Sequence, residues 1–335
     1  MTRVRFAPSP TGTLHVGNAL SAVANRRLGD WFLLRIDDTD PTRNVPGGEE
    51  AILDDLAWLG IAWDEGPVRQ SERTERYLDA ARTAGVEQRF DGVMLWRDDG
   101  SPTFHLASVV DDHDFAITHV IRGSDHRANE ELHAALHRAL GFEPPIVIHH
   151  GLVVGADGRK LAKRADGATV ASLRDDGYPA EAVRAYLEEL DLPRHDVHLD
   201  LDRIRSLSVD MLTAMPDDEL AARVGVPVRA APLVRGAHDL GEARALAASV
   251  LEPPARGLAG PRSRETLERF VELRSPLPEV LDKDAARAVL RELKAVGGDL
   301  RALREALTGR DRGPELWAVL CALPRDEAIR RARLT

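Results

Sequence analysis

Short apolar runs alternate with helical patterns over the first part of the chain. Runs rich in β-branched, aromatic and aliphatic residues predict strands, and apolar residues repeating about every 3.6 positions predict helices. The expected strands cover residues 4–7, 31–36, 93–96, 115–121 and 146–149, and the expected helices cover 17–28, 47–59 and 129–140. This alternation is typical of a parallel sheet with crossover helices. We therefore expect a doubly wound, Rossmann-like α/β domain at residues 1–165.

The strand pattern fades in the second half of the chain, where helical patterns follow one another. Further helices are expected at 178–190, 264–274, 284–296 and 300–307. Residues 228–260 are rich in Pro, Gly and Ala, which fits either a linker or a helical region broken by prolines. We expect a helical region at 166–227 and an all-α domain at 228–335.

Composition narrows the class of protein. The chain has 335 residues, 43% of them hydrophobic, and a formal net charge of −10. No apolar run approaches the roughly 18 residues of a membrane span, and the N-terminus has no secretory signal pattern. Cys321 is the single cysteine, so the chain can form neither an internal disulfide nor a zinc site built on paired thiolates. We expect a cytoplasmic protein without zinc.

The charges are unevenly distributed. Residues 1–255 carry a net charge of −14 and residues 256–335 carry +4. The acidic total argues against a non-specific nucleic-acid binder and makes the last third the place to expect a polyanion contact. Only four of the 45 basic residues are lysines, and two of these are Lys160 and Lys163.

The segment at 6–18 has features of an anion site. A Pro-Ser-Pro turn leads to Gly12, and His15 and Gly17 stand at the start of the predicted helix. Glycine allows close approach of a phosphate, and the free N–H groups of a helix start favour an anion. A proline-rich surface loop before an ordinary helix is the alternative.

The segment at 155–164 is locally basic. It has glycines at 155 and 158, followed by Lys160, Lys163 and Arg164. Such a loop can close over nucleotide phosphates and neutralise charge on departing pyrophosphate. A solvated basic turn is the alternative. The scarcity of lysine elsewhere favours a role for a compact ammonium group here.

Together the two segments resemble the signature pair of class I aminoacyl-tRNA synthetases. The HIGH motif is written HVGN at 15–18, and the KMSKR motif is written KLAKR at 160–164. The segments that are similar to glutamyl-tRNA synthetases, in the same order, are RFAPSPTG at 5–12, LRIDDTD at 34–40, VPGGEE at 45–50, QSER at 70–73 and VVDDH at 109–113. The resemblance is strong over 3–190 and visible again at 303–309 and 313–316.

This resemblance implies an enzyme that activates glutamate with ATP as glutamyl adenylate and transfers it to an acceptor, as a glutamate–tRNA ligase does. It implies glutamate, ATP and tRNA as partners, Mg²⁺ carried by the ATP, no metal of the protein's own, and contact of residues 166–227 with the tRNA stem. We expect a monomer that does not bind membranes.

The resemblance also assigns residues to roles. The residues implied in catalysis are His15, Lys160, Lys163 and Arg164. Those implied in binding ATP are Pro8, Gly12, His15, Gly17, Asn18 and Lys163. Those implied in binding the amino acid are Arg5, Ser9, Asp37, Phe104, Ser108 and Arg122. Arg5 and Arg122 would hold the two carboxylates of glutamate, a role that suits the guanidinium fork.

The chain departs from the family pattern at several places. Asp37 stands where the family usually has glutamate, Phe104 where it has tyrosine, and Ser108 where it has asparagine. Loss of polar partners can weaken discrimination between ligands. Only ten residues separate Ala81 from Gly92, where relatives carry an inserted domain that grips the tRNA acceptor end, and the C-terminal helical region is also reduced.

These departures leave alternatives open. The chain could be a paralogue that transfers an activated amino acid to a small amine or a carrier. Glutamyl-queuosine tRNA(Asp) synthetase is a weaker alternative, because those enzymes usually carry zinc cysteines and lack the C-terminal segments. A non-catalytic interaction protein is weaker still. A metal site at the scattered histidines 105, 113, 119, 126, 133 and 137 is also open, although ordinary polar histidines fit the spacing better.

The basic loop generates a first prediction. Lys163→Ala should lower the turnover of adenylate formation far more than the affinity for ATP, because the ammonium stabilises charge that develops in the transition state. ATP–pyrophosphate exchange at varied ATP concentration measures both quantities. An unchanged turnover would remove Lys163 from the catalytic set.

Overall fold

The chain forms two compact units. One comprises residues 1–175 and 180–204, and the other comprises 176–179 and 205–335. The computed structural model describes all residues except 156, 160, 162–167, 253–260 and 334–335. The domain boundaries predicted at residues 165 and 227 divide the chain by function and not by compactness. They stay predictions.

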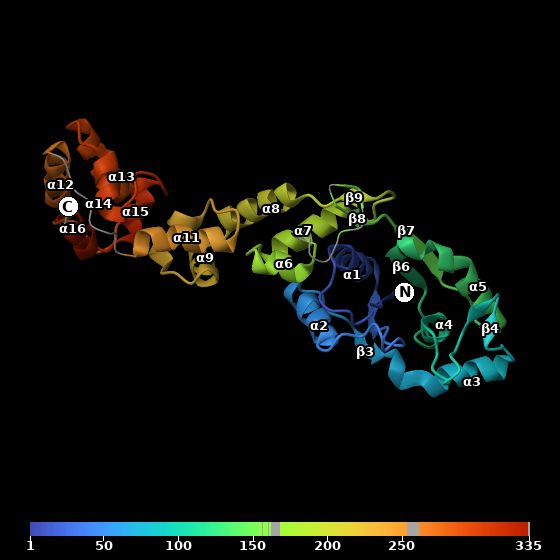
Figure 1. The fold of residues 1–335 in the computed structure, drawn as a ribbon. Helices are drawn as coiled ribbons and strands as arrows, with labels where there is room; N and C mark the ends of the chain where they lie inside the picture. The colour runs from blue at the N-terminus through green and yellow to red at the C-terminus, as the bar shows by residue number, and fades with distance from the viewer. Residues whose placement is uncertain (156, 160, 162–167, 253–260, 334–335) are drawn as a thin grey trace. The chain divides into compact units, whose positions relative to one another are not determined.

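Parallel strands form the centre of the first unit (Figure 1). They are β1 (Arg3–Phe6), β2 (Trp31–Ile36), β3 (Glu65–Arg69), β6 (His119–Gly123) and β7 (Ile146–His150). β2 pairs with β1 and β3, and β6 pairs with β7, all in parallel. β6 lies beside β1, where the amide of Thr118 donates to the carbonyl of Arg3 at 2.9 Å. The predicted Rossmann-like class is confirmed.

Helices surround these strands. They are α1 (Val16–Leu28), α2 (Gly48–Trp58), α3 (Thr74–Ala84), α4 (Phe104–Asp114), α5 (Glu130–Ala139), α6 (Val170–Asp175) and α7 (Ala180–Leu190), with 3₁₀ turns η1 (Gln70–Arg73) and η2 (Ser124–Asn129). α1 contacts β1, β2 and β6 and also packs against α7. Its buried Ala19 and Ala22 have small side chains, and small residues allow a helix to lie close to its neighbours. Phe32, Leu33 and Leu34 of β2 are all buried, as expected of a strand covered on both faces.

Two predicted strands differ from the structure. β5 (Val93–Met94) does not join the parallel strands but pairs antiparallel with β4 (Arg89–Phe90). Asp91 and Gly92 between them have φ values of 49° and 77°, which a tight two-residue hairpin requires. The strand expected at 115–121 begins only at His119, because α4 continues to Asp114 and a turn with positive φ follows at Ala116. A further small parallel pair joins β8 (Val153–Val154) and β9 (Val197–His198).

The second unit is helical throughout the part that the structure describes. Its helices are α9 (Asp217–Val224), η3 (Val228–Ala230), α10 (Ala231–Val234), α11 (Leu240–Leu251), α12 (Pro261–Arg274), α13 (Lys283–Ala295), α14 (Leu300–Thr308), α15 (Leu316–Ala322) and α16 (Arg325–Arg333), preceded by α8 (Leu201–Ala214), which begins in the first unit. Phe270, Leu293 and Leu320 are fully buried in one core. Since η3, α10 and α11 contribute buried residues to that core, the linker interpretation is wrong for 228–251.

A buried carboxylate holds the loop that leads into α1. Asp55 of α2 is 1% exposed and accepts a hydrogen bond from the amide of Leu14 at 2.7 Å and another from the hydroxyl of Thr13. Arg174 of α6 lies 3.6 Å from its other oxygen. Gly48 allows α2 to come this close, because a Cβ there would lie 2.4 Å from the carbonyl oxygen of Pro10. α2 and α6 thus fix the start of α1 from two sides.

Removal of this carboxylate should destabilise the first unit. Asp55→Ala leaves the buried amide of Leu14 without its partner, and we expect a loss of about 2 kcal/mol in the free energy of unfolding. Asp54→Ala changes an exposed aspartate on the same helix and should cost less than about 0.5 kcal/mol. Urea unfolding of both variants measures the difference, and equal midpoints would contradict this role for Asp55.

Candidate active site

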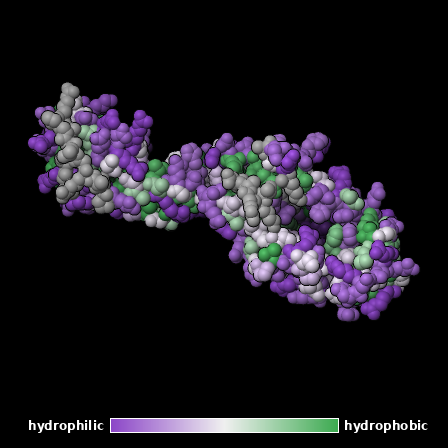
Figure 2. All heavy atoms as spheres, in the orientation of Figure 1, coloured by the Kyte–Doolittle hydropathy of each residue, from purple (hydrophilic) through white to green (hydrophobic). Residues whose placement is uncertain are grey.

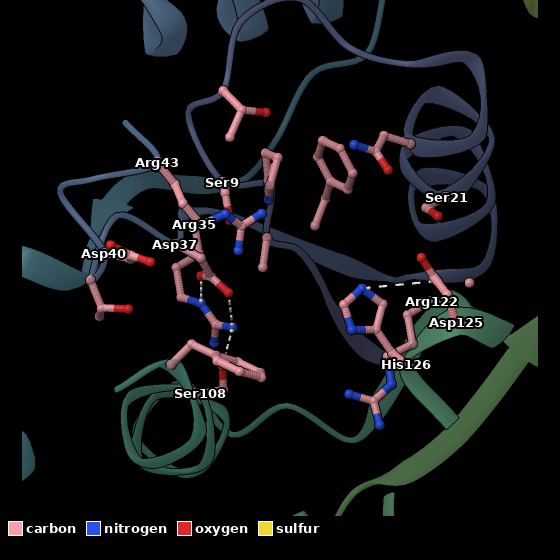
Figure 3. Close-up of a pocket in the computed structure, with 18 of the residues that line it drawn as sticks. Ser9, Ser21, Arg35, Asp37, Asp40, Arg43, Ser108, Arg122, Asp125 and His126 are labelled. Carbon is pink, nitrogen blue, oxygen red and sulfur yellow. Dashed lines mark hydrogen bonds and ion pairs between the residues drawn. The ribbon is translucent and has the colours of Figure 1, made fainter. Parts of the chain in front are cut away.

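A pocket of about 760 Å³ opens at the carboxyl ends of the parallel strands. Its walls come from the ends of β1, β2, β6 and β7, the start of α1, and the first turns of α4. Open α/β sheets commonly bind ligands at this edge, and the volume suits a small organic ligand. Figure 3 shows Arg35, Asp37 and Ser108 on one side and Arg122, Asp125 and His126 on the other.

Most of the residues predicted to bind ligands line this one pocket. They are Arg5, Pro8, Ser9, His15, Gly17, Asn18, Asp37, Phe104, Ser108 and Arg122. Gly12 is not among the lining residues, although its neighbour Thr11 is. Its φ of 104° is a conformation that favours glycine, and its predicted role in binding ATP stays a prediction. Lys160, Lys163 and Arg164 lie outside the described residues, and their roles stay predictions.

His15 joins the two signature segments. It caps α1, and its Nδ1 accepts a hydrogen bond from the amide of Gly17 at 3.2 Å. The proton of the neutral ring therefore sits on Nε2, which donates to the carbonyl of Leu161 at 3.0 Å. Leu161 belongs to the KLAKR segment, so the side chain of His15 in the first segment contacts the backbone of the second.

Backbone hydrogen bonds also hold Ala168 and Val170, which follow the basic segment. The amide of Val16 donates to the carbonyl of Ala168 at 3.0 Å, and the amide of Val170 donates to that of Leu14 at 2.9 Å. The residues on both sides of 162–167 therefore lie against the start of α1. This arrangement brings the two segments to the same end of the pocket.

A buried network of charges forms the floor of the pocket. The guanidinium of Arg35, 1% exposed, lies 2.7 Å from Asp37 and 3.0 Å from Asp112, and Nη2 donates to the hydroxyl of Ser108 at 3.2 Å. Arg5 lies 3.2 Å from the same oxygen of Asp112. Sequence reasoning missed Arg35 as a site residue, because its carboxylate partner Asp112 is 77 positions away.

The charges of this network shift its acidic groups in opposite directions. Burial raises the pKa of Asp37, although Arg35 works against the shift. Burial also disfavours the charged form of Asp112, but Arg5 and Arg35 together outweigh it and lower the pKa of that carboxyl. Asp112 is therefore ionised and forms ion pairs with both arginines.

Arg122 is a cation of the pocket with few protein partners. Its Nε donates to Nε2 of His149 at 3.4 Å, and no carboxylate of the described residues lies within 4.0 Å of it. Burial, followed by repulsion from Arg5, lowers the pKa of Arg122 to about 10. The group still carries its charge at neutral pH. A half-buried cation of this kind is an attractive partner for a ligand carboxylate.

The pocket is also lined by residues outside the predicted ATP-binding and amino-acid-binding sets. His105, His126 and His133 line it, whereas His113, His119 and His137 do not. Ser21 and His150 line it too, with the hydroxyl of Ser21 2.7 Å from Nε2 of His150. Ser21 and the four histidines come from five separate elements, so no local sequence pattern places them together.

Among the described residues, no group of three His, Cys, Asp or Glu side chains could hold a metal ion. No helix in that part is both long and apolar enough to cross a membrane. The expectation that the protein has no resident metal stays a prediction.

Comparisons with known proteins agree with these observations. The family model for tRNA synthetases class I (E and Q), catalytic domain, matches residues 1–84 and 83–203. Glutamate–tRNA ligase 1 of Rubrobacter xylanophilus is 35% identical, with 98% of this chain and 96% of that protein covered. Glutamate–tRNA ligase of Methylacidiphilum infernorum is 30% identical, with 98% and 97% covered. The first alignment runs over 416 positions against the 335 residues of this chain, which is therefore shorter.

The fold is similar to that of a solved structure. A glutamate tRNA ligase from Elizabethkingia meningosepticum, in complex with its amino acid, superposes with a TM-score of 0.79 at 22% sequence identity, with 99% of this chain and 98% of that chain covered. At this identity the match shows the fold, and it extends over the helical second half as well as the sheet.

His133, a half-buried histidine of the pocket, generates a prediction on acid stability. Burial, followed by the charges of Arg122 and His105, lowers the pKa of His133 to about 3. The unfolded chain takes up this proton near its ordinary pKa of about 6.5, whereas the native state takes it up only near 3, so stability falls as pH drops between these values. Between pH 7 and 5 the wild type should lose about 2 kcal/mol more than His133→Gln. Urea unfolding at both pH values tests this, and parallel losses would contradict the shift.

Proposed function

The chain belongs to the class I tRNA synthetase family for glutamate and glutamine, and on this premise we propose that it is a glutamate–tRNA ligase. It would activate glutamate with ATP as glutamyl adenylate and transfer the glutamyl group to tRNA. The observation that carries the proposal is one pocket lined by two arginines, Arg5 and Arg122, and by the histidine-capped start of α1.

The two arginines support glutamate as the amino acid. Arg5 is already paired with Asp112, whereas Arg122 has no acidic partner within 4.0 Å among the residues described. A ligand with two carboxylates would complete the coordination of both guanidinium groups. The ammonium of the substrate would approach Asp37, although that carboxylate also binds Arg35.

Adenylate formation needs positioning and charge neutralisation rather than a protein nucleophile. A carboxylate oxygen of glutamate attacks the α-phosphorus of ATP, the bond between that phosphorus and the bridging oxygen breaks, and pyrophosphate leaves. Gly17 and Asn18 at the start of α1 would hold the nucleotide beside His15. Lys163, with Lys160 and Arg164, would neutralise the leaving group. Mg²⁺ would arrive with the ATP and supply further charge neutralisation.

A basic stripe on α13 supports an RNA acceptor. Lys283, Arg287, Arg291 and Lys294 follow the spacing i, i+4, i+8 and i+11 and are all exposed. Successive cations on such a stripe are about 6 Å apart, close to the phosphate spacing of a nucleic-acid strand. Within the described residues, none of the four has a carboxylate within 4.0 Å. The visible face of the helices that include α13 is mainly hydrophilic (Figure 2).

The shortened catalytic unit supports the alternative of a non-tRNA acceptor. The family model matches in two segments that meet at residues 83–84, just before the β4–β5 hairpin. This is where the family's acceptor-end insertion is expected and where this chain has only ten residues between Ala81 and Gly92. A small amine or a carrier would need no such insertion. The alternative therefore becomes an outcome of the functional test.

ATP–pyrophosphate exchange with glutamate, with and without tRNA, tests the proposed function. We expect glutamate-dependent exchange and transfer of labelled glutamate to tRNA. Strong exchange without any labelled tRNA would favour the non-tRNA acceptor. Charging confined to tRNA(Asp) would favour the queuosine enzyme, and no exchange with glutamate under any condition would overturn the proposal.

Arg122 generates a prediction for this assay. Arg122→Ala removes the cation that faces the substrate carboxylate, so the KM for glutamate should rise by about 100-fold while the KM for ATP stays within about twofold. Arg138→Ala changes an exposed arginine of α5 and is the matched control. Normal glutamate dependence in Arg122→Ala would show that the amino acid binds elsewhere.

The stripe on α13 generates a prediction for tRNA binding. The slope of log K against log salt should become shallower by about two in the double variant Arg287→Ala, Arg291→Ala, because up to two phosphate contacts are lost. The matched control removes Arg269 and Arg301, two exposed arginines of the same unit that are paired with Glu272 and Glu305. Filter binding at several salt concentrations measures the slopes, and equal slopes in both variants would exclude the stripe from the interface.

A further inference from the structure

Two histidines form a hydrogen-bonded pair in the wall of the pocket. Nδ1 of His105, in the first turn of α4, lies 3.0 Å from Nε2 of His133 on α5. Their rings are nearly perpendicular at 82°, and the ring of Phe104 lies 3.9 Å from that of His105 and 5.9 Å from that of His133, centroid to centroid. All three side chains line the same pocket as Arg5 and Arg122. The pair therefore lies beside the two predicted carboxylate sites.

The shared hydrogen bond couples the tautomers of the two rings. A neutral imidazole has one N–H donor and one acceptor nitrogen. If Nδ1 of His105 donates to Nε2 of His133, then His133 must carry its proton on Nδ1, and Nε2 of His105 is left as an acceptor. If the hydrogen bond runs the other way, both free nitrogens exchange roles. In either state the pair offers one donor and one acceptor to its surroundings.

Each ring keeps one nitrogen for a ligand. In the part of the chain that the structure describes, Nδ1 of His133 and Nε2 of His105 have no hydrogen-bond partner. Burial, followed for His133 by the charge of Arg122, lowers the pKa of both histidines, so both rings are neutral at neutral pH. The donor and acceptor pattern is thus available under ordinary conditions.

Asp37 and Ser108, two other polar residues of the pocket, are already hydrogen-bonded to Arg35. Asp37 accepts from Nε and Nη2 of Arg35 at 2.7 and 3.3 Å, and the hydroxyl of Ser108 accepts from the same guanidinium. Phe104 has no polar atom on its side chain. A bound zwitterion therefore finds few free acceptors for its ammonium near α4, apart from Nε2 of His105.

We propose that His105 and His133 together recognise the carboxylate and the ammonium of the amino acid. His133 donates from Nδ1 to the carboxylate held by Arg122, which selects the tautomer in which Nε2 of His105 accepts from the substrate ammonium. The pair thereby replaces the hydroxyl and amide that Phe104 and Ser108 do not supply. This inference rests on the proposed function, since it takes glutamate as the ligand.

Exchange kinetics test the role of the pair. His133→Phe and His105→Phe should each raise the KM for glutamate by about tenfold, with kcat and the KM for ATP within about twofold, because a ground-state contact to the amino acid is lost. His113→Phe is the matched control, because His113 stacks on Phe142 and does not line the pocket. Adding Phe104→Tyr and Ser108→Asn to His133→Phe should restore at least part of the glutamate affinity.

A ligand without an ammonium separates the two histidines. Glutarate competes with glutamate for the carboxylate sites, and the wild type should bind glutamate more tightly than glutarate. That preference should fall by about tenfold in His105→Phe and stay within about twofold in His133→Phe.

Nitrogen-15 spectra of the histidine rings give a readout that does not depend on catalysis. With glutamate bound, His133 should be protonated on Nδ1 and His105 on Nδ1, with both Nε2 atoms unprotonated. His133→Gln and His105→Gln assign the signals by their loss.

The outcomes separate this inference from the proposed function. A wild type without glutamate-dependent exchange overturns both. A wild type that activates glutamate, together with unchanged KM values and unchanged glutarate preference in both Phe variants, overturns the histidine pair alone. Ring tautomers of the opposite sense with glutamate bound would also overturn it.

Discussion

The pocket depends on the ion pairs that the buried guanidinium of Arg35 forms. Transfer of an ion into a protein interior costs several kcal/mol unless it is paired and hydrogen-bonded. Arg35 meets this condition through Asp37, just after the end of its strand, and through Asp111 and Asp112 on α4. The strand and the helix cannot separate without leaving buried charges unpaired. The relative position of β2 and α4, and with it one wall of the pocket, follows from this requirement.

The same network extends outward and makes α4 a rigid support. Asp111 accepts from the hydroxyl of Tyr77 at 3.0 Å and from Nε of Arg73 at 2.9 Å, which links α4 to α3 and η1. Burial, followed by the charge of Asp111, raises the pKa of Tyr77, so the hydroxyl remains a donor. The side chains on the first turns of α4 therefore face the pocket from a fixed base. Such support is what a binding site needs to hold its contacts in place.

The four lysines of the chain fall into two pairs. Two of the four lysines belong to the basic segment at 155–164, and the other two lie on the exposed face of α13. The first pair belongs to the predicted chemistry on ATP and the second to the predicted contact with RNA. Arginine serves instead where a buried, forked partner for carboxylates is needed, as at Arg5, Arg35 and Arg122.

Local sequence patterns predicted several elements correctly, and the ordered motifs predicted the family. The periodicity of 31–36 and 17–28 predicted β2 and α1 to within a residue, and ordered motifs pointed to Arg5, His15 and Arg122, which do line one pocket. Tertiary structure alone decided that 93–94 forms a hairpin, that Arg35 is a buried hub, and that His105 meets His133. The physical reason is range: turn propensity and helical period act over a few residues, whereas these contacts join side chains 28 or 77 positions apart, or depend on which partner strand is within reach.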